Sequence, residues 1–163
     1  MKLHLLMLGK TRRPELRALL EDYVKRIGRY SPIEITEVRD ESAALKKLDA
    51  DRAATVVLLD AAGKSLDSNA LAKWLADQRD RGARQLTFLC GDAEGFPEAL
   101  RRRARQTLSL SAMTFSHELA RVMLAEQLYR AFAILSSSPR PAMWTSFSSR
   151  RGSATWSMTL AAC

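Results

Sequence analysis

Runs of apolar residues without polar alternation mark the buried strands of this chain. Such runs fill residues 3–8, 54–60 and 86–90, as expected for strands of a parallel sheet that is covered on both faces. Residues 33–38 and 107–110 also read as strands. Five strands are therefore predicted, spread over most of the chain.

Between these runs, apolar residues recur at helical spacing. Pro14 begins one predicted helix, residues 42–48 form a short one, and Asp67 or Ser68 caps a third that Gly82 ends. Pro97 opens a fourth, and a long last helix follows the final strand. Three of the helices carry a clear apolar stripe: Leu16, Leu19, Leu20, Tyr23, Val24 and Ile27; Leu71, Trp74, Leu75 and Gln78; Ala120, Met123, Leu124, Leu128, Ala131 and Leu135.

The regular alternation of strand and helix predicts an α/β fold, a mostly parallel sheet with helices on both faces. Residues 1–135 form a single predicted domain without an internal repeat. In such sheets ligands bind where the loops gather beyond the carboxyl ends of the strands. Three loops follow buried strands: LDAAGKSL, CGDAEGFP and LSLSAMTFSH. We therefore expect them to form a ligand pocket together.

The composition of the chain indicates which kind of partner the domain binds. The 163 residues carry a net charge of +8, which favours an anionic partner such as nucleic acid. The basic clusters are Lys10, Arg12 and Arg13, and Arg101, Arg102, Arg103 and Arg105; a solvated helix face is the alternative interpretation. No run approaches the ~18–20 apolar residues of a membrane span. No secretory signal is recognisable at the N-terminus, so a cytoplasmic location is expected.

The inventory of reactive residues is small. Two cysteines form no disulfide or metal framework, and two histidines make a histidine metal site improbable. The glycine-rich phosphate-binding motifs of nucleotide folds are absent, which disfavours a flavodoxin-like cofactor domain. The segment from Gly91 to Gly95, with its acidic residues, suits a ligand that carries positive charge or hydroxyls; a generic turn is the alternative.

Four stretches carry a resemblance to a known family: MKLHLLMLGK, VVLLDAAGKSLDS, FLCGDAEGFP and, above all, LSLSAMTFSHELARVMLAEQLYRA. Across residues 1–135 the chain resembles the ribosomal RNA large subunit methyltransferase H family of the SPOUT group. It departs from that family at Gly91-Asp92, where two glycines are usual.

The resemblance implies an enzyme that methylates N3 of a pseudouridine in 23S rRNA with S-adenosylmethionine. It also implies a homodimer acting on the large subunit or the 70S ribosome, and a C-terminal trefoil knot. Because a sulfonium methyl donor is already electrophilic, no metal is expected, and the protein's task is positioning. The positions that match the family's cofactor contacts are Leu59, Gly91, Leu110, Ser111, Ala112, Met113, Thr114 and Phe115.

Two residues of the last helix are the candidate catalytic pair. His117 and Arg121 are four positions apart, and therefore on one helix face. We expect them to flank the substrate base or phosphate at the mouth of the pocket. In the alternative interpretation His117 caps the helix locally, and Arg121 forms a salt bridge with Glu118 or Glu94.

The tail, residues 136–163, departs from the family. It is rich in Ser, Pro and Arg, contains no acid, and is expected to be disordered. The family's short ending, of the form His-Pro-Tyr-His-Arg, is absent, so its terminal catalytic residues cannot be carried over. A translated frameshift and a genuine extension both explain such a tail. A non-catalytic module that keeps the cofactor pocket and binds RNA or the ribosome is the alternative function.

Overall fold

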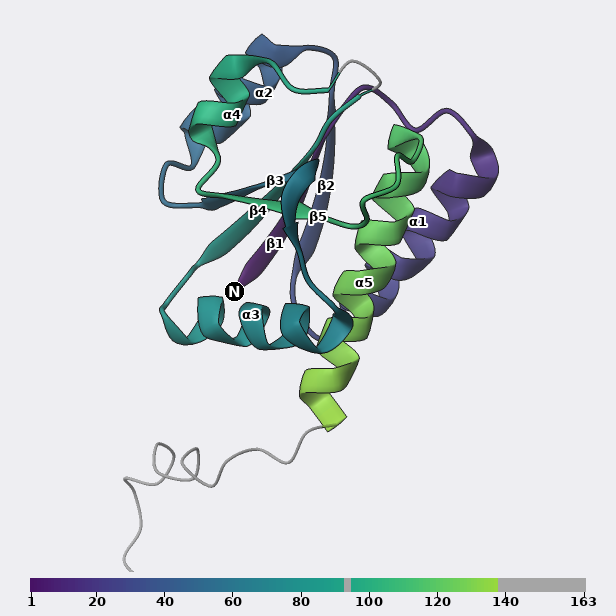
Figure 1. Ribbon diagram of the computed structural model, residues 1–163, viewed down its shortest axis with the longest axis vertical. Coiled ribbons are helices and arrows are strands. Elements are labelled where there is room, and N and C mark those ends of the chain that lie inside the picture. Colours follow the sequence, from purple (N-terminus) through teal and green to yellow (C-terminus); the bar gives the residue numbers. More distant parts are fainter. Residues whose placement is uncertain (93–94, 138–163) are drawn as a thin grey trace, which may run out of the picture.

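The computed structural model describes residues 1–92 and 95–137, and in this part of the chain strands and helices alternate as predicted (Figure 1). The predicted tail lies outside the described residues, apart from its first two positions. The elements in order are β1 (Lys2–Leu8), α1 (Pro14–Ile27), β2 (Ile33–Val38), α2 (Glu41–Ala50), β3 (Thr55–Ser65), α3 (Ser68–Asp80), β4 (Gln85–Cys90), α4 (Glu98–Arg103), β5 (Gln106–Ser109) and α5 (His117–Ser137).

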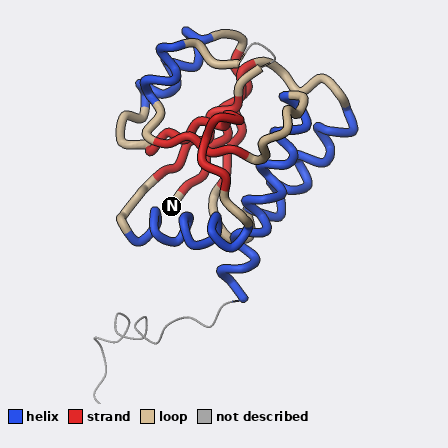
Figure 2. Tube along the Cα trace, viewed as in Figure 1, coloured by secondary structure: helices blue, strands red, loops and turns tan. Residues whose placement is uncertain are grey.

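The five strands form one sheet in the order β2-β1-β4-β3-β5, and every neighbouring pair is parallel. Helices α1, α3 and α5 cover one face, whereas α2 and α4 cover the other (Figures 1 and 2). Side chains of β1 alternate between the two cores: Leu3, Leu5 and Met7 face the first set of helices, and Leu6 and Leu8 face the second. The predicted fold class, an α/β sheet with helices on both faces, is confirmed.

Local signals in the sequence set several helix ends. The Asp67 side chain accepts a hydrogen bond from the Ala70 amide at 2.7 Å and so caps α3 as predicted. Pro14 occupies the first turn of α1, where its missing amide hydrogen costs nothing. Gly82, at φ 81°, follows the end of α3 in a conformation that other residues rarely adopt.

One predicted loop is wrong. Residues 60–65 continue β3 as strand, rather than forming an open loop after residue 60. The ladder with β5 shifts register there, so that Leu108 pairs with both Leu59 and Lys64. Gly63 makes this possible, because a Cβ at this position would lie 2.6 Å from the Leu108 carbonyl carbon. The strand therefore bulges and then resumes its pairing with β5.

Helix α5 differs in part from its predicted stripe. It packs against both α1 and α3, so its buried face is wider than a single stripe and includes Arg121, Val122 and Ala125. Ala120, Met123 and Leu135 are only partly buried, and α5 extends to Ser137, past the predicted boundary at residue 135. On α1, Leu19 is 48% exposed although it belongs to the apolar stripe.

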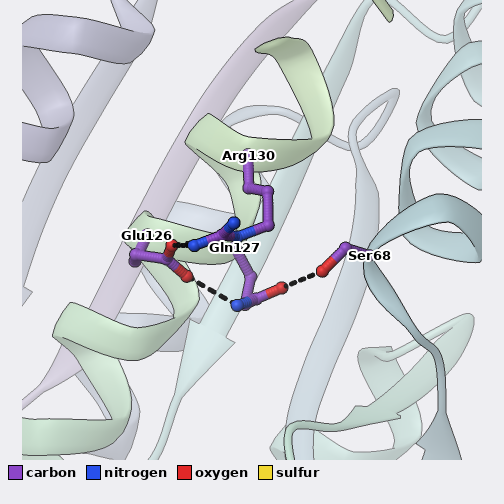
Figure 3. A network of polar contacts seen from close by, with 4 residues as sticks. All are labelled: Ser68, Glu126, Gln127 and Arg130. Carbon is purple, nitrogen blue, oxygen red and sulfur yellow. Dashed lines mark hydrogen bonds and ion pairs between the residues drawn. The ribbon is translucent and has the colours of Figure 1, made fainter. Parts of the chain in front are cut away.

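Polar contacts tie α5 to the start of α3 (Figure 3). The Ser68 hydroxyl donates to Gln127 Oε1 at 2.9 Å, and the Gln127 amide donates to Glu126. Arg130 Nε donates to Glu126 Oε1 at 3.0 Å, which fixes the same carboxylate from the next turn. The knotted threading of this helix stays a prediction. No described helix has the length and apolar character needed to cross a membrane.

Candidate functional site

A cavity of about 260 Å³ lies at the carboxyl edge of the sheet, beside the bulge of β3 and the ends of β4 and β5. The three segments that were expected to meet do contribute to it, although the first is a bulged strand rather than a loop. Its walls are formed by Leu59, Asp60, Ala61, Cys90, Gly91, Asp92, Gly95, Phe96, Leu110, Ser111, Met113, Thr114, Phe115, His117 and Ala120.

Seven of the eight positions expected to contact a cofactor line this cavity: Leu59, Gly91, Leu110, Ser111, Met113, Thr114 and Phe115. Ala112 is exposed and is not part of the wall. Sequence reasoning did not single out Asp60, Ala61 or Phe96. All three lie within the quoted segments LDAAGKSL and CGDAEGFP, so the rule that ligands bind at the carboxyl edge was the signal that could have found them.

Gly91 forms a tight part of the wall. A Cβ at this position would lie 3.1 Å from the Phe96 ring and 3.2 Å from the Gly95 carbonyl oxygen. Both distances are shorter than an ordinary van der Waals contact, so a side chain here would push the turn after β4 out of place. The absence of a Cβ therefore gives the cavity a wall of main chain at Gly91.

Serine side chains shape the glycine-free segment between β5 and α5. The Ser109 hydroxyl donates to the Ser111 carbonyl at 2.9 Å, and the Met113 amide donates to Ser111 Oγ at 3.0 Å. Such short-range bonds hold a turn without glycine. Ser116 then begins α5, since its carbonyl accepts from the Ala120 amide at 2.9 Å. Met113, 73% exposed, lies on the rim of the cavity.

Two acidic residues lie in the wall of the cavity. Asp60 and Asp92 both contribute to the wall. Arg101 Nη1 forms an ion pair with Asp60 Oδ2 at 2.9 Å, and its guanidinium lies 5.9 Å from the centre of the Phe96 ring. The ion pair holds α4 at the edge of the cavity. Within the described residues, no group of acidic, His and Cys side chains is arranged to hold a metal ion.

Cys90 lines the cavity but is not a nucleophile. Burial raises the pKa of its thiol to about 12, so the thiolate is negligible near neutral pH. This agrees with the position of Cys90 in the apolar run of residues 86–90.

His117 and Arg121 do not form the expected pair at the mouth. His117 lines the cavity, whereas Arg121 is fully buried and faces the end of β1. Arg121 Nη1 donates to the Thr11 hydroxyl at 3.0 Å, and Nη2 donates to the Leu8 carbonyl. Four residues advance a helix slightly more than one turn, and on this closely packed helix that rotation moves the second side chain inside.

The alternative interpretation, a salt bridge of Arg121, is wrong for Glu118, whose carboxylate accepts a hydrogen bond from the Arg13 amide instead. Glu94 lies outside the described residues. Burial lowers the pKa of Arg121, because it disfavours the charged form. Its Nε has no hydrogen-bond partner among the described residues. A buried cation held by neutral oxygens therefore lies behind the helix that carries His117.

A family model and curated relatives match most of the chain. The family model described as "Predicted SPOUT methyltransferase" matches residues 1–139. Ribosomal RNA large subunit methyltransferase H of Pelobacter propionicus is 44% identical, and that of Solibacter usitatus is 46% identical; each alignment covers 85% of this chain and 98% of the relative. A solved structure, the SpoU methyltransferase AviRb from Streptomyces viridochromogenes in complex with AdoMet, is 12% identical. It aligns with a TM-score of 0.47 over 85% of this chain and 59% of its own.

Proposed function

The chain belongs to the SPOUT methyltransferase family, and from that membership we propose that it transfers a methyl group from S-adenosylmethionine to 23S rRNA. The observation that carries the proposal is the cavity at the carboxyl edge, lined by seven of the positions that match the family's cofactor contacts. Its main-chain wall at Gly91 allows a ligand to approach closely, and the carboxylate oxygens of its wall are acceptors for ribose hydroxyls.

When bound, the cofactor supplies an electrophilic methyl group on a positively charged sulfur. The residues of the chain then have two tasks. The wall formed by Leu59, Gly91 and the segment from Leu110 to Phe115 orients the donor, and its apolar members exclude water. His117, on the cavity wall, would accept the proton that the acceptor nitrogen loses.

The acceptor is N3 of a pseudouridine in the large-subunit rRNA. The names of the relatives support an rRNA of the large subunit, and the nucleotide follows from the family resemblance. Arg121 acts as a positioning residue rather than a contact to the base, because its guanidinium is buried against Thr11 and Leu8.

The proposal includes a homodimer in the cytoplasm. Leu19 of α1, Tyr30 of the turn after α1 and Leu119 of α5 are large apolar residues that stay exposed in the single chain. A second copy of the chain would cover them. Light scattering at micromolar concentration is expected to give twice the mass of the chain. A monomeric mass would contradict this part of the proposal.

The decisive experiment is methyl transfer from labelled S-adenosylmethionine to ribosomes whose 23S rRNA lacks the modification. Incorporation into 23S rRNA at one pseudouridine is expected, and a His117→Ala variant should transfer more slowly while binding the cofactor normally. The altered sequence after residue 135 favours one competing function, a non-catalytic module. Cofactor binding by calorimetry without any transfer would establish that alternative, and absence of binding would contradict both.

A further inference from the structure

Thr11 anchors the segment between β1 and α1 to three other elements. Its amide donates to Glu37 Oε1 of β2 at 2.8 Å, and its carbonyl accepts from Arg17 Nη2 of α1 at 2.7 Å. Its hydroxyl accepts from the buried Arg121 of α5 at 3.0 Å. Thr11 itself is 1% exposed. One small residue therefore fixes the connection from three directions.

Further bonds hold the rest of this segment, residues 9–13, which we name the latched loop. The Gly9 amide donates to the Val38 carbonyl at 2.8 Å, and Gly9 turns the chain at φ 75°. The Arg13 amide donates to Glu118 Oε2 at 3.1 Å. Glu118 is the neighbour of His117 on α5, so the loop lies beside the helix start that forms one wall of the cavity, as Figure 1 shows.

The latched loop exposes three cations. Lys10, Arg12 and Arg13 are all exposed. The nearby carboxylates, Glu37 and Glu118, accept main-chain amides of the loop rather than its side chains. Among the described residues, none of the three side chains forms an ion pair. The cations are thus held on a rigid support and directed toward solvent next to the cavity.

We propose that the latched loop binds backbone phosphates of the substrate RNA next to the acceptor nucleotide, and that Thr11 is its positioning residue. The proposal rests on the proposed function, since it takes the substrate to be RNA. Phosphate contacts fix the register of a nucleic acid on a protein without reading its sequence. A loop that is already fixed loses little further freedom on binding, so its contacts retain more of their strength.

The first test removes the charges. The variant Lys10→Ala/Arg12→Ala/Arg13→Ala is compared with Arg52→Ala/Arg81→Ala/Arg84→Ala, which removes three exposed arginines outside the two basic clusters and without ion pairs among the described residues. Ribosome affinity is measured between 50 and 200 mM salt. At ~0.7 per phosphate contact, the loop variant should lose about 2 from the slope of log K against log salt. The control should stay near the wild type, and both should bind S-adenosylmethionine normally. Equal slopes for the two variants would overturn the proposal.

The second test removes the hydrogen bond between Arg121 and the Thr11 hydroxyl without changing the charge of the loop. Thr11→Val keeps the shape but removes the hydroxyl that accepts from Arg121, whereas Thr11→Ser keeps it. With both variants folded by circular dichroism, Thr11→Val should raise the Michaelis constant for ribosomes several-fold and leave cofactor affinity unchanged. Thr11→Ser should behave as the wild type. Identical values for Val and Ser would refute the positioning role. Failure of the wild type to transfer methyl groups would contradict the proposed function instead, and ribosome binding would still decide the role of the loop.

Discussion

Gly63 allows β3 and β5 to approach closely, and Gly63→Ala tests whether this approach sets the stability of the domain. The added Cβ would lie 2.6 Å from the Leu108 carbonyl carbon and 2.8 Å from both the Leu108 nitrogen and the Thr107 carbonyl carbon. All three atoms are main chain, so no side chain can turn aside. One strand must move by roughly 0.8 Å before the closest pair reaches ordinary contact.

Two opposing contributions decide whether Gly63→Ala stabilises or destabilises the domain. Overpacking of a filled site costs about 1–3 kcal/mol, and contact with three backbone atoms places this case at the upper end. Replacement of glycine by alanine also restricts the unfolded chain, which returns about 0.4–1 kcal/mol. We therefore expect a net loss of about 2 kcal/mol. For a domain of this size the melting temperature should fall by about 4–8 °C.

Thermal unfolding followed by circular dichroism measures the effect. Gly28→Ala is the matched control, because its Cβ would meet the Lys25 carbonyl oxygen at 3.4 Å, on backbone at φ −55°. That variant should melt within about 2 °C of the wild type. Since β5 leads directly into the cavity wall at Leu110, Gly63→Ala should also weaken cofactor binding. A variant as stable as the control would show that the bulge accommodates the methyl group, and the reasoning would fail.

Three further predictions concern the cavity and the tail. Gly91→Val should lower cofactor affinity by tenfold or more, about 1.4 kcal/mol, with the fold retained; unchanged affinity by calorimetry would remove Gly91 from the site. The folded-state pKa of Cys90, about 12, exceeds the unfolded value of ~8.5. The contribution of this thiol to the free energy of unfolding is therefore fully present below pH ~8.5. Above that pH it falls by ~1.4 kcal/mol per pH unit, until about pH 12. The free energies of unfolding of the wild type and Cys90→Ala, measured by denaturant titration at several pH values, should diverge by that slope. If the two stay parallel as the pH rises, burial is not the cause of the raised pKa. Replacing residues 138–163 with a His-Pro-Tyr-His-Arg ending should raise turnover by ~10²-fold at unchanged cofactor affinity, and full activity of the chain as it stands would refute this.

The fold was predictable because its strands and helices carry independent local signals. Asp67 and Pro14 mark helix starts, and apolar runs such as residues 86–90 mark strands buried on both faces. The extension of β3 to Ser65 was not predictable, because residues 60–65 contain Asp, Gly, Lys and Ser, which are typical of a loop. Pairing with β5 overrides that local preference.

The site was predictable only in outline. The carboxyl-edge rule located the cavity, and the family resemblance supplied its residues, such as Gly91 and Phe115. Helical spacing could not reveal the burial of Arg121, since a charged residue is ordinarily assigned to the exposed face. Its partners, Leu8 and Thr11, are more than a hundred positions away, and no local pattern encodes such a contact.

The strand order has a consequence for synthesis of the chain. While the first 84 residues are made, β1 and β2 can pair with each other, but β3 has neither of its neighbours, β4 and β5. At ~5–20 residues per second, β3 waits about one to several seconds for β4 to follow it out of the ribosome. During that interval its apolar segment, TVVLL, exposes unpaired backbone and both of its faces. The nascent chain is therefore most prone to misassociation between residues 65 and 90, and a chaperone that binds apolar extended segments would act there.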